Sequence, residues 1–491
     1  MNYIRKNQSL FLILLFIFIL GFSPVKDTDF GWHYRCGLPR NPEHTLGTFW
    51  LRGKQIITGD TPCLKNTFSY YLSNYQAYYS SFLSDLSIAT IYDFGGKFIG
   101  LSIFGSMLFV ISAIFFIFIF PQINIFVSTF IFSLIFWLSS GVLDLGIRAQ
   151  NFTFTFFIVL LYLLKNLDTK KNWKLIFFPL LFFIWVNTHI GFFIGFVPLG
   201  LFFIQSLLEH KNQIKVFLIL ITSFLATLIN PFSLKIYWEI YHHATIPLNT
   251  LIAEWVPPNL YMVILVVISS TIVTVLLLPS FRKKLFLITL LLFTTILTLT
   301  ARRNLPLFWT VVLYSFLQTP FSIRNFSKRL DEKYSAIFGS ILVTLILIIG
   351  AINIPKTIVF DTSWSDYCSK GLYGYPCQAV KDYPKLNGNV FATYEWGGFL
   401  IWQKPKIKVF VDGRMPAWKG EDNKSPYQTY LEIIQTQPGW NETLRKYKTD
   451  FLLISQGTFL DLLLEKEAKK FNWQEVYRKG GVVIYKKIKN I

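Results

Sequence analysis

Apolar and polar residues divide the chain into a long hydrophobic part and a polar C-terminal part. Apolar stretches close to the length of a membrane-spanning helix recur from Ser9 to Asn353, whereas the runs after Ile354 are too short to cross a bilayer. This pattern predicts a first helix over residues 9–22 and further helices at roughly 97–120, 123–140, 150–164, 175–188, 190–208, 215–229, 260–279, 285–300, 306–319 and 335–353. We therefore expect a polytopic α-helical membrane protein with about eleven transmembrane helices in residues 1–354 and a long first loop over residues 24–96.

The polar part, residues 355–491, alternates short strand-like runs with helical stretches. The strand-like runs are 389–393, 408–411, 451–454 and 481–485, and the helical stretches lie near 398–402, 426–436 and 459–471. This alternation predicts a small α/β domain at the C-terminal end of the chain.

Composition and charge support this division. Hydrophobic residues make up 53% of the chain and the mean hydropathy is +0.45, far outside the range of a soluble domain with one core. The formal charge is +20, but most Lys and Arg residues of the hydrophobic part lie in short breaks between apolar stretches. That placement follows the positive-inside rule of membrane proteins and argues against a nucleic-acid-binding protein.

The basic residues also predict the orientation in the membrane. Arg5 and Lys6 precede the first apolar run and no small-residue cleavage site follows it, so we expect an uncleaved first helix with a cytoplasmic N-terminus. The later basic breaks then face the cytoplasm, and the first loop and residues 355–491 lie on the extracytoplasmic side of the cell membrane. These breaks contain Lys165, Lys170, Lys171 and Lys174, then Lys211 and Lys215, then Arg282, Lys283 and Lys284, and finally Arg324, Lys328, Arg329 and Lys333.

All four cysteines fall on the extracytoplasmic side in this orientation. An oxidising compartment permits disulfides there. The economical pairs are Cys36 with Cys63 and Cys368 with Cys377, although four unpaired thiols are also compatible with the sequence.

Ionisable residues outside the basic breaks are candidates for function, because charge is costly near a membrane. In the predicted orientation they gather at the extracytoplasmic ends of the helices. At that place the cations would hold a lipid-linked phosphate, and the carboxylates beside them would activate a hydroxyl. Arginines also anchor helix ends at lipid headgroups, and a lone histidine is often simply packed in the protein. The residues are Asp27, Asp29, His33, Asp144, Arg148, His189, Asn230, Glu254, Arg302 and Arg303.

Asp27 and Asp29 allow three interpretations. A neighbouring like charge would raise the pKa of one carboxyl and prepare it to act as a base. The pair would alternatively hold a divalent metal ion, the only cofactor that the sequence suggests. Asp-Thr-Asp is also a sequence typical of a simple turn or helix cap.

The clearest resemblance to a known family lies at these residues, where the sequence reads Asp27-Thr28-Asp29-Phe30-Gly31-Trp32-His33. It is similar to the D-x-D-x-x-W-H first loop of a group of bacterial multi-pass membrane proteins in the GT-C class, the glycosyltransferases that use lipid-linked donors. The similarity continues through Gly59-Asp60-Thr61-Pro62, Phe68-Ser69-Tyr70, Arg148-Ala149-Gln150, Trp185-Val186-Asn187-Thr188-His189-Ile190-Gly191, Asn230-Pro231-Phe232, Glu254-Trp255-Val256-Pro257 and Arg302-Arg303-Asn304-Leu305-Pro306.

A more distant resemblance is to the catalytic subunits of oligosaccharyltransferases. Their first loop has an Asp followed by an aromatic, Asn-Tyr-Arg run that Asp29 to Arg35 resembles, which favours Asp29 as the catalytic position. Their soluble domain carries a W-W-D-Y-G signature, which Tyr394-Glu395-Trp396-Gly397-Gly398 resembles only in part, so recognition of a peptide acceptor is not implied. Related bacterial loops place an acidic residue before the Phe-Ser-Tyr segment, where this chain has Asn66.

Two short segments of the C-terminal part are further candidates. Asp412-Gly413-Arg414 follows a predicted strand, and its charges either face the membrane site or form a local ion pair in a turn. Glu395 and Trp396 precede paired glycines and either admit an acceptor or begin a helix. The sequence has no GxGxxG, no phosphate loop and no Cys/His spacing typical of structural zinc.

These residues together predict an inverting GT-C glycosyltransferase that moves a sugar from a polyprenyl-phosphate donor to an extracytoplasmic glycan, lipid or protein acceptor. An inactive envelope scaffold of the same class is an alternative. A transporter or flippase is disfavoured, because ionisable residues are scarce within the helices. In the leading interpretation Asp29 is the base, with Asp27 and His33 beside it; Arg148, His189, Arg302 and Arg303 bind the donor phosphate; and Glu254, Glu395, Trp396, Asp412 and Arg414 serve the acceptor or support the site.

Overall fold

The chain forms two compact units. The computed structural model describes residues 2–39, 52–54, 63–73, 75–167, 172–246, 252, 254–319, 335–358, 374–420 and 423–488. The first unit consists of Met1–Val25, Phe98–Leu234 and Ile252–Ile358, and the second of Lys26–Lys97, Lys235–Leu251 and Val359–Ile491. The string Gly59 to Pro62, Cys368 and the basic residues Lys170, Lys171, Arg324, Lys328, Arg329 and Lys333 lie outside the described residues.

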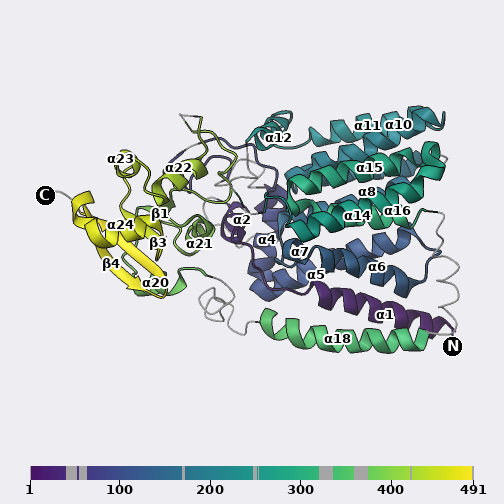
Figure 1. Cartoon of the computed structure of the whole chain (residues 1–491), viewed down its shortest axis with the longest axis horizontal. Helices are drawn as coiled ribbons and strands as arrows, with labels where there is room; N and C mark the ends of the chain where they lie inside the picture. The colour runs from purple at the N-terminus through teal and green to yellow at the C-terminus, as the bar shows by residue number, and fades with distance from the viewer. Residues whose placement is uncertain are drawn as a thin grey trace. The chain divides into compact units, whose positions relative to one another are not determined.

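The first unit is a bundle of apolar helices that run roughly parallel to one another (Figure 1). A helix is present at every range that the hydrophobic pattern predicts. α1 packs against α18, where the side-chain amide of Asn353 donates to the carbonyl of Ile19 (3.4 Å). The helices are α1 Asn2–Gly21, α5 Lys97–Ile119, α6 Ile125–Leu138, α8 Ala149–Lys165, α9 Phe177–Val186, α10 Phe196–Leu208, α11 Gln213–Thr227, α14 Leu260–Leu277, α15 Phe281–Thr300, α16 Leu305–Phe316 and α18 Ser335–Thr357, with the short α7 Ser140–Leu143 after α6.

Several stretches of this unit are suited to a bilayer. In the described part of the chain, 4 stretches are long and apolar enough to cross a membrane: Lys97–Ile119, Ile190–Leu208, Leu260–Thr300 and Ile337–Thr357. Only 11% of the apolar window in Ile337–Thr357 is buried, so most of its side chains face outward, as expected of a helix against lipid. These apolar stretches indicate a membrane protein. The number of spans and the orientation of the termini stay predictions.

The second unit contains a mixed five-stranded sheet with the order β2-β1-β3-β5-β4. β1 pairs in parallel with β2 and β3, whereas β5 pairs antiparallel with β3 and β4. The strands are β1 Asn389–Ala392, β2 Lys408–Val409, β3 Phe451–Ser455, β4 Trp473–Lys479 and β5 Val482–Lys487. The helices of this unit are α2 Phe30–Cys36, α4 Phe82–Phe94, α12 Lys235–Thr245, α20 Cys377–Asp382, α21 Gly397–Gln403, α22 Pro426–Ile434, α23 Trp440–Lys446 and α24 Phe459–Glu467.

The first loop contributes to the core of this sheet. Ser69 forms a parallel bridge to Val409, and its hydroxyl donates to the carbonyl of Phe410 (2.8 Å). Tyr70 and Tyr71 are buried in the same cluster as the side chains of β1, β3 and β5. The C-terminal strands therefore share their core with the first loop. That the membrane-embedded part of the chain ends at residue 354 stays a prediction.

Disulfides are present in the second unit. Cys36, at the end of α2, is bonded to Cys63, as predicted. Cys377 at the start of α20 is also disulfide-bonded. Cys36 and its partner thus tie α2 to the segment that enters the sheet core.

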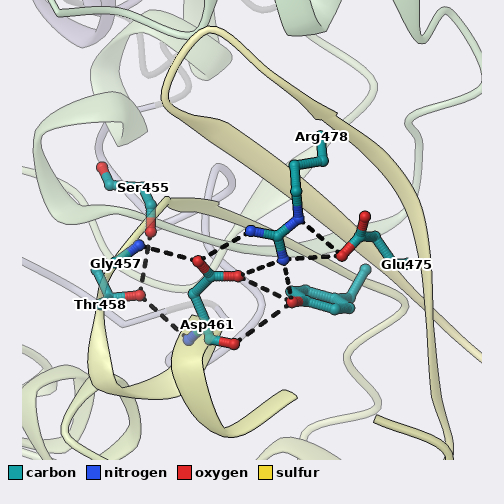
Figure 2. Close-up of polar contacts among 7 residues, drawn as sticks. Ser455, Gly457, Thr458, Asp461, Glu475 and Arg478 are labelled. Atoms are coloured by element: carbon teal, nitrogen blue, oxygen red, sulfur yellow. Dashed lines mark hydrogen bonds and ion pairs between the residues drawn. The ribbon is translucent and has the colours of Figure 1, made fainter. Parts of the chain in front are cut away.

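A charged network fixes α24 to the sheet (Figure 2). Asp461, in the first turn of α24, accepts from the backbone N–H of Gly457 (2.9 Å) and pairs with Arg478 of β4 (2.8 Å). The hydroxyl of Tyr485 donates to the same carboxylate (2.8 Å), and Glu475 pairs with Arg478 from the other side (2.7 Å). Asp461 is buried, so its charge is compensated within the protein.

Candidate functional site

Asp27 and Asp29 form a tight turn that starts α2. The carboxylate of Asp27 accepts from the backbone N–H of Asp29 (3.2 Å), and the carbonyl of Asp29 accepts from the N–H of His33 (3.1 Å). Asp29 therefore occupies the N-cap position of α2, with its backbone rather than its side chain making the helix contact. The turn predicted as an alternative is present, and it holds the two aspartates next to each other in sequence and space.

His33 is paired with a buried carboxylate from α4. Its Nδ1 lies 2.5 Å from Asp85 Oδ1, and both side chains are almost fully buried. Burial acts to lower the pKa of His33, but the charges of Asp85, Asp27 and Asp29 outweigh it and raise that pKa above its ordinary value. An imidazole held through Nδ1 by a carboxylate presents Nε2 for proton transfer or hydrogen bonding.

Asp85 was not among the site residues predicted from the sequence. It lies 52 residues after His33, and sequence spacing gives no sign that they meet. The available signal was an aspartate among the apolar residues Phe82, Leu83 and Leu86, since a buried acid needs a partner.

Asp412-Gly413-Arg414 forms the local ion pair that the sequence left as one option. The guanidinium of Arg414 donates to both carboxylate oxygens of Asp412 (2.8 and 2.7 Å). It also donates to the side-chain oxygen of Asn66 (3.1 Å). Arg414 lies over the ring of Phe68 at 4.9 Å. Asn66 therefore supplies a neutral acceptor to Arg414 at the position where the bacterial loops that this chain resembles have an acidic residue.

Glycines bring these segments into direct contact. A Cβ atom at Gly413 would meet the carboxylate of Asp29, and one at Gly31 would meet the backbone carbonyl of Gly398. Because a backbone carbonyl cannot turn aside as a side chain can, Gly31 permits an approach of α2 to α21 that no other residue allows. The Asp-Thr-Asp turn, the paired glycines and the Asp412 turn are thus packed together within the second unit.

Tyr394 lies beside this cluster. Burial raises its pKa well above the ordinary value, and the charges of Asp29 and Asp412 raise it further. The next residue, Glu395, is exposed, whereas Trp396 is buried and its indole N–H donates to the carbonyl of Gly374 (2.8 Å). Glu395 is therefore accessible to a ligand, and Trp396 is held in place by the protein.

The predicted phosphate-binding arginines lie in the first unit. Arg148, which is buried, pairs with Glu254 at 2.7 Å. The guanidinium of Arg303 lies 4.4 Å from the ring centre of Trp255, and the N–H of Arg302 donates to the carbonyl of Val256 (2.9 Å). The segment after Ala253 is thereby attached to the turn between α15 and α16.

The charge of Glu254 is stabilised by this cluster. Burial acts to raise its pKa, but the charge and hydrogen bond of Arg148 and the charges of Arg303 and Arg302 outweigh burial and lower the pKa. The charges of three cations therefore act on one carboxylate, and the local charge is positive. Such a cluster suits an anionic ligand.

His189 is held firmly through one ring nitrogen. Its Nδ1 accepts from the N–H of Gly191 (3.1 Å) and lies 2.7 Å from the hydroxyl of Thr153, which itself accepts from the indole of Trp185 (2.9 Å). Thr153 lies on α8, the helix that Arg148 precedes as N-cap. The structure thus shows a buried, oriented histidine.

No metal cluster is found within the described ranges: no group of three or more His, Cys, Asp or Glu side chains there is arranged to hold a metal ion. The proposal that Asp27 and Asp29 bind a divalent cation stays a prediction.

Comparison with known proteins identifies a fold. Family models gave no match, and neither did curated protein sequences. Solved structures of the oligosaccharyltransferase of Archaeoglobus fulgidus are similar. The apo form has a TM-score of 0.56 at 11% identity, with 93% of this chain and 70% of that chain covered. The form tethered to an acceptor peptide has a TM-score of 0.58 at 11% identity over the same shares.

A third structure gives the same result. It is the archaeal oligosaccharyltransferase AglB from the same organism, in complex with an inhibitory peptide and a dolichol-phosphate. Its TM-score is 0.56 at 12% identity, and 98% of this chain and 74% of that chain are covered. The chain therefore shares the fold of these oligosaccharyltransferase structures, as the more distant resemblance predicted. The closer likeness to bacterial proteins with a D-x-D-x-x-W-H loop stays a prediction.

Proposed function

We propose that this protein is a membrane glycosyltransferase that moves a sugar from a polyprenyl-phosphate donor to an extracytoplasmic acceptor with inversion at the anomeric carbon. The observation that carries the proposal is the packing of Asp29 against Gly413 and near Tyr394, in a chain with an oligosaccharyltransferase fold. One of the similar structures holds a dolichol-phosphate and another an acceptor peptide, which is in keeping with a lipid carrier and an acceptor.

The proposed reaction is a single displacement. Asp29 takes the proton of the acceptor hydroxyl as the hydroxyl oxygen attacks the anomeric carbon. The bond from that carbon to the phosphate oxygen breaks, and its electron pair leaves with the phosphate. Asp27 accepts a hydrogen bond from the backbone of Asp29, and Asp85 holds His33 in place. Asp27 and His33 would then keep a charged environment around the base. A divalent cation bound by Asp27 and Asp29 is the alternative role for this pair.

Cations would stabilise the leaving phosphate. Arg148, Arg302 and Arg303 form one positively charged group around Glu254, and we propose that this group binds the donor phosphate together with His189. Glu254 orients Arg148 by their 2.7 Å contact.

On the acceptor side, Glu395 is exposed and is the residue proposed to contact the acceptor. Trp396, Asp412 and Arg414 are buried or paired, so their proposed role is to shape that region rather than to react.

Replacement of Asp29 tests the function. D29N keeps the size of the side chain but removes the base, so we expect sugar transfer from a labelled polyprenyl-phosphate hexose to fall by about 10²–10⁴-fold in proteoliposomes. The matched control is D382N, because Asp382 is an exposed carboxylate of the same unit, and it should keep wild-type activity.

The outcomes separate the alternatives. Full transfer by D29N would remove Asp29 from the mechanism. If the wild-type protein itself transfers no sugar, the inactive-scaffold interpretation is favoured instead. Transfer that stops on addition of a chelator and returns with a divalent cation would support the metal-binding role of the aspartate pair.

A further inference from the structure

α12 carries an outward stripe of large apolar and aromatic side chains. Trp238 and Tyr241 are each 54% exposed, and Leu234 just before the helix is 61% exposed. Positions 238 and 241 are three residues apart within α12 and therefore lie on one face of the helix. The opposite face is buried through Ile236 and Glu239. α12 is therefore an amphipathic helix whose apolar stripe points away from the second unit.

The exposed rings are organised. Trp238 and Tyr241 stack at 5.2 Å with an interplanar angle of 24°, and His242 lies 5.1 Å from Trp238. Each of these rings has an apolar body and a polar N–H or O–H group. Trp and Tyr with this character are enriched where a membrane meets water.

The inner face of α12 is attached to the first loop. The backbone N–H of Tyr78 donates to the carboxylate of Glu239. The Nζ atom of Lys235 lies 6.0 Å from the ring centre of Tyr78. Nδ1 of His243 donates to the carbonyl of Glu239 (2.9 Å), which stiffens the last turn. Since the inner face is occupied, the aromatic stripe is the side left for another partner.

We propose that this partner is the lipid surface, and that α12 lies in the membrane interface with Trp238 and Tyr241 among the headgroups. The helix is tied at both ends to apolar helices. Only residues 228–234 separate it from α11, a span of roughly 25 Å at most. α11 faces outward with large apolar side chains, Ile214 at 76% exposed among them, and Ile229 continues this exposed apolar series along the chain.

The chain after α12 supports the same partner. α14 begins with Leu260 and Tyr261, both strongly exposed, so an apolar residue and an interfacial aromatic residue again mark the start of an apolar helix. Lys235 at the start of α12 is exposed and carries a positive charge suited to lipid phosphates. Through its buried face, α12 would then set the depth of the first loop, which carries the Asp-Thr-Asp turn.

Site-directed spin labelling tests this placement, independently of any transfer activity. Cys36, Cys63 and Cys377 are disulfide-bonded, so an introduced thiol is expected to react selectively, with labelled wild-type protein as the blank. The variants W238C and Y241C would carry a nitroxide in proteoliposomes of phosphatidylethanolamine and phosphatidylglycerol. T245C, an exposed position one turn further, keeps both aromatic rings.

The measurement is the collision rate of the nitroxide with oxygen, which concentrates in lipid, and with a water-soluble nickel chelate. We expect a higher oxygen-to-nickel ratio at positions 238 and 241 than at F459C, the control at an exposed phenylalanine of α24. T245C should follow the stripe, which guards against a fold altered by loss of a ring. A ratio equal to that of F459C would place the stripe in water and overturn the proposal. Protection from both reagents would mean that protein covers it, a second copy or another chain, and would overturn the proposal as well.

Discussion

A single methyl group at position 413 tests whether the position of Asp29 matters. In G413A the new Cβ would meet the carboxylate of Asp29. Asp29 has a short side chain whose carboxylate is its far end, so the side chain can rotate while the backbone stays in place. The perturbation therefore moves one functional group without removing it.

The expected cost to stability is small. Forcing a side chain away from its preferred rotamer costs about 0.5–1.5 kcal/mol. Replacing glycine by alanine returns about 0.4–1 kcal/mol by restricting the unfolded chain, since Gly413 has no left-handed backbone conformation to lose. The net change is then within ~1 kcal/mol, a shift of a few degrees in the thermal midpoint. The expected change in the activation free energy of transfer is larger, because a 10²–10⁴-fold fall in rate on loss of a positioned base corresponds to about 2.7–5.4 kcal/mol.

The assay pairs thermal unfolding with sugar transfer from the labelled polyprenyl-phosphate hexose. G374A is the matched control, because a Cβ at Gly374 would meet nothing within 4 Å and should alter neither quantity. We expect G413A to unfold near the wild-type temperature and to lose most of its transfer activity. Transfer near the wild-type rate in G413A, alongside an inactive D29N, would refute the idea that this contact positions the base.

Two carboxylates should make stability depend on pH in opposite ways. Burial raises the pKa of Glu239 to about 7 from its ordinary 4.5, so the folded chain holds this proton more tightly and stability falls as pH rises between those values. E239Q should flatten this part of the pH profile of thermal unfolding, by ~3 kcal/mol at most, and an unchanged slope would contradict the assignment. Burial acts to raise the pKa of Asp461, but the hydrogen bonds from Arg478, Gly457 and Tyr485 outweigh burial and lower that pKa. The stability that this carboxylate contributes is therefore fully present above its unfolded-state pKa and is lost as pH falls through its folded-state pKa. D461N should cost about 1–3 kcal/mol near pH 7 and much less near pH 3, and an equal loss at both would show that its charge is unimportant.

The helices could be predicted because their signal is local. Long apolar stretches identify α5, α14 and α18, and the predicted and observed limits agree within a few residues. α4 was missed, although it is a helix of 13 residues, because it lies in a loop between two apolar stretches and has a mixed sequence. β4 was missed because it is an edge strand with several charged residues, including Glu475 and Arg478, and lacks a buried face of its own.

The candidate site was predictable in its parts but not in its contacts. Asp29, His33 and Arg414 were identified from residue type and position. Their partners were not, because Asn66 lies 348 residues before Arg414 and sequence spacing says nothing about such a pair. Gly413 was predicted to lie in a turn, and the structure shows in addition that its missing side chain leaves the space that the Asp29 carboxylate occupies.

The bridge between Ser69 and Val409 has a consequence for how this protein is made. Tyr70 and Tyr71 emerge from the ribosome early, but the strands that bury them are synthesised more than 300 residues later. The early segment therefore cannot bury its aromatic rings in this core until nearly the whole chain has been synthesised. A C-terminal fragment expressed alone would lack those rings, and a chain truncated before β3 would leave them exposed to solvent.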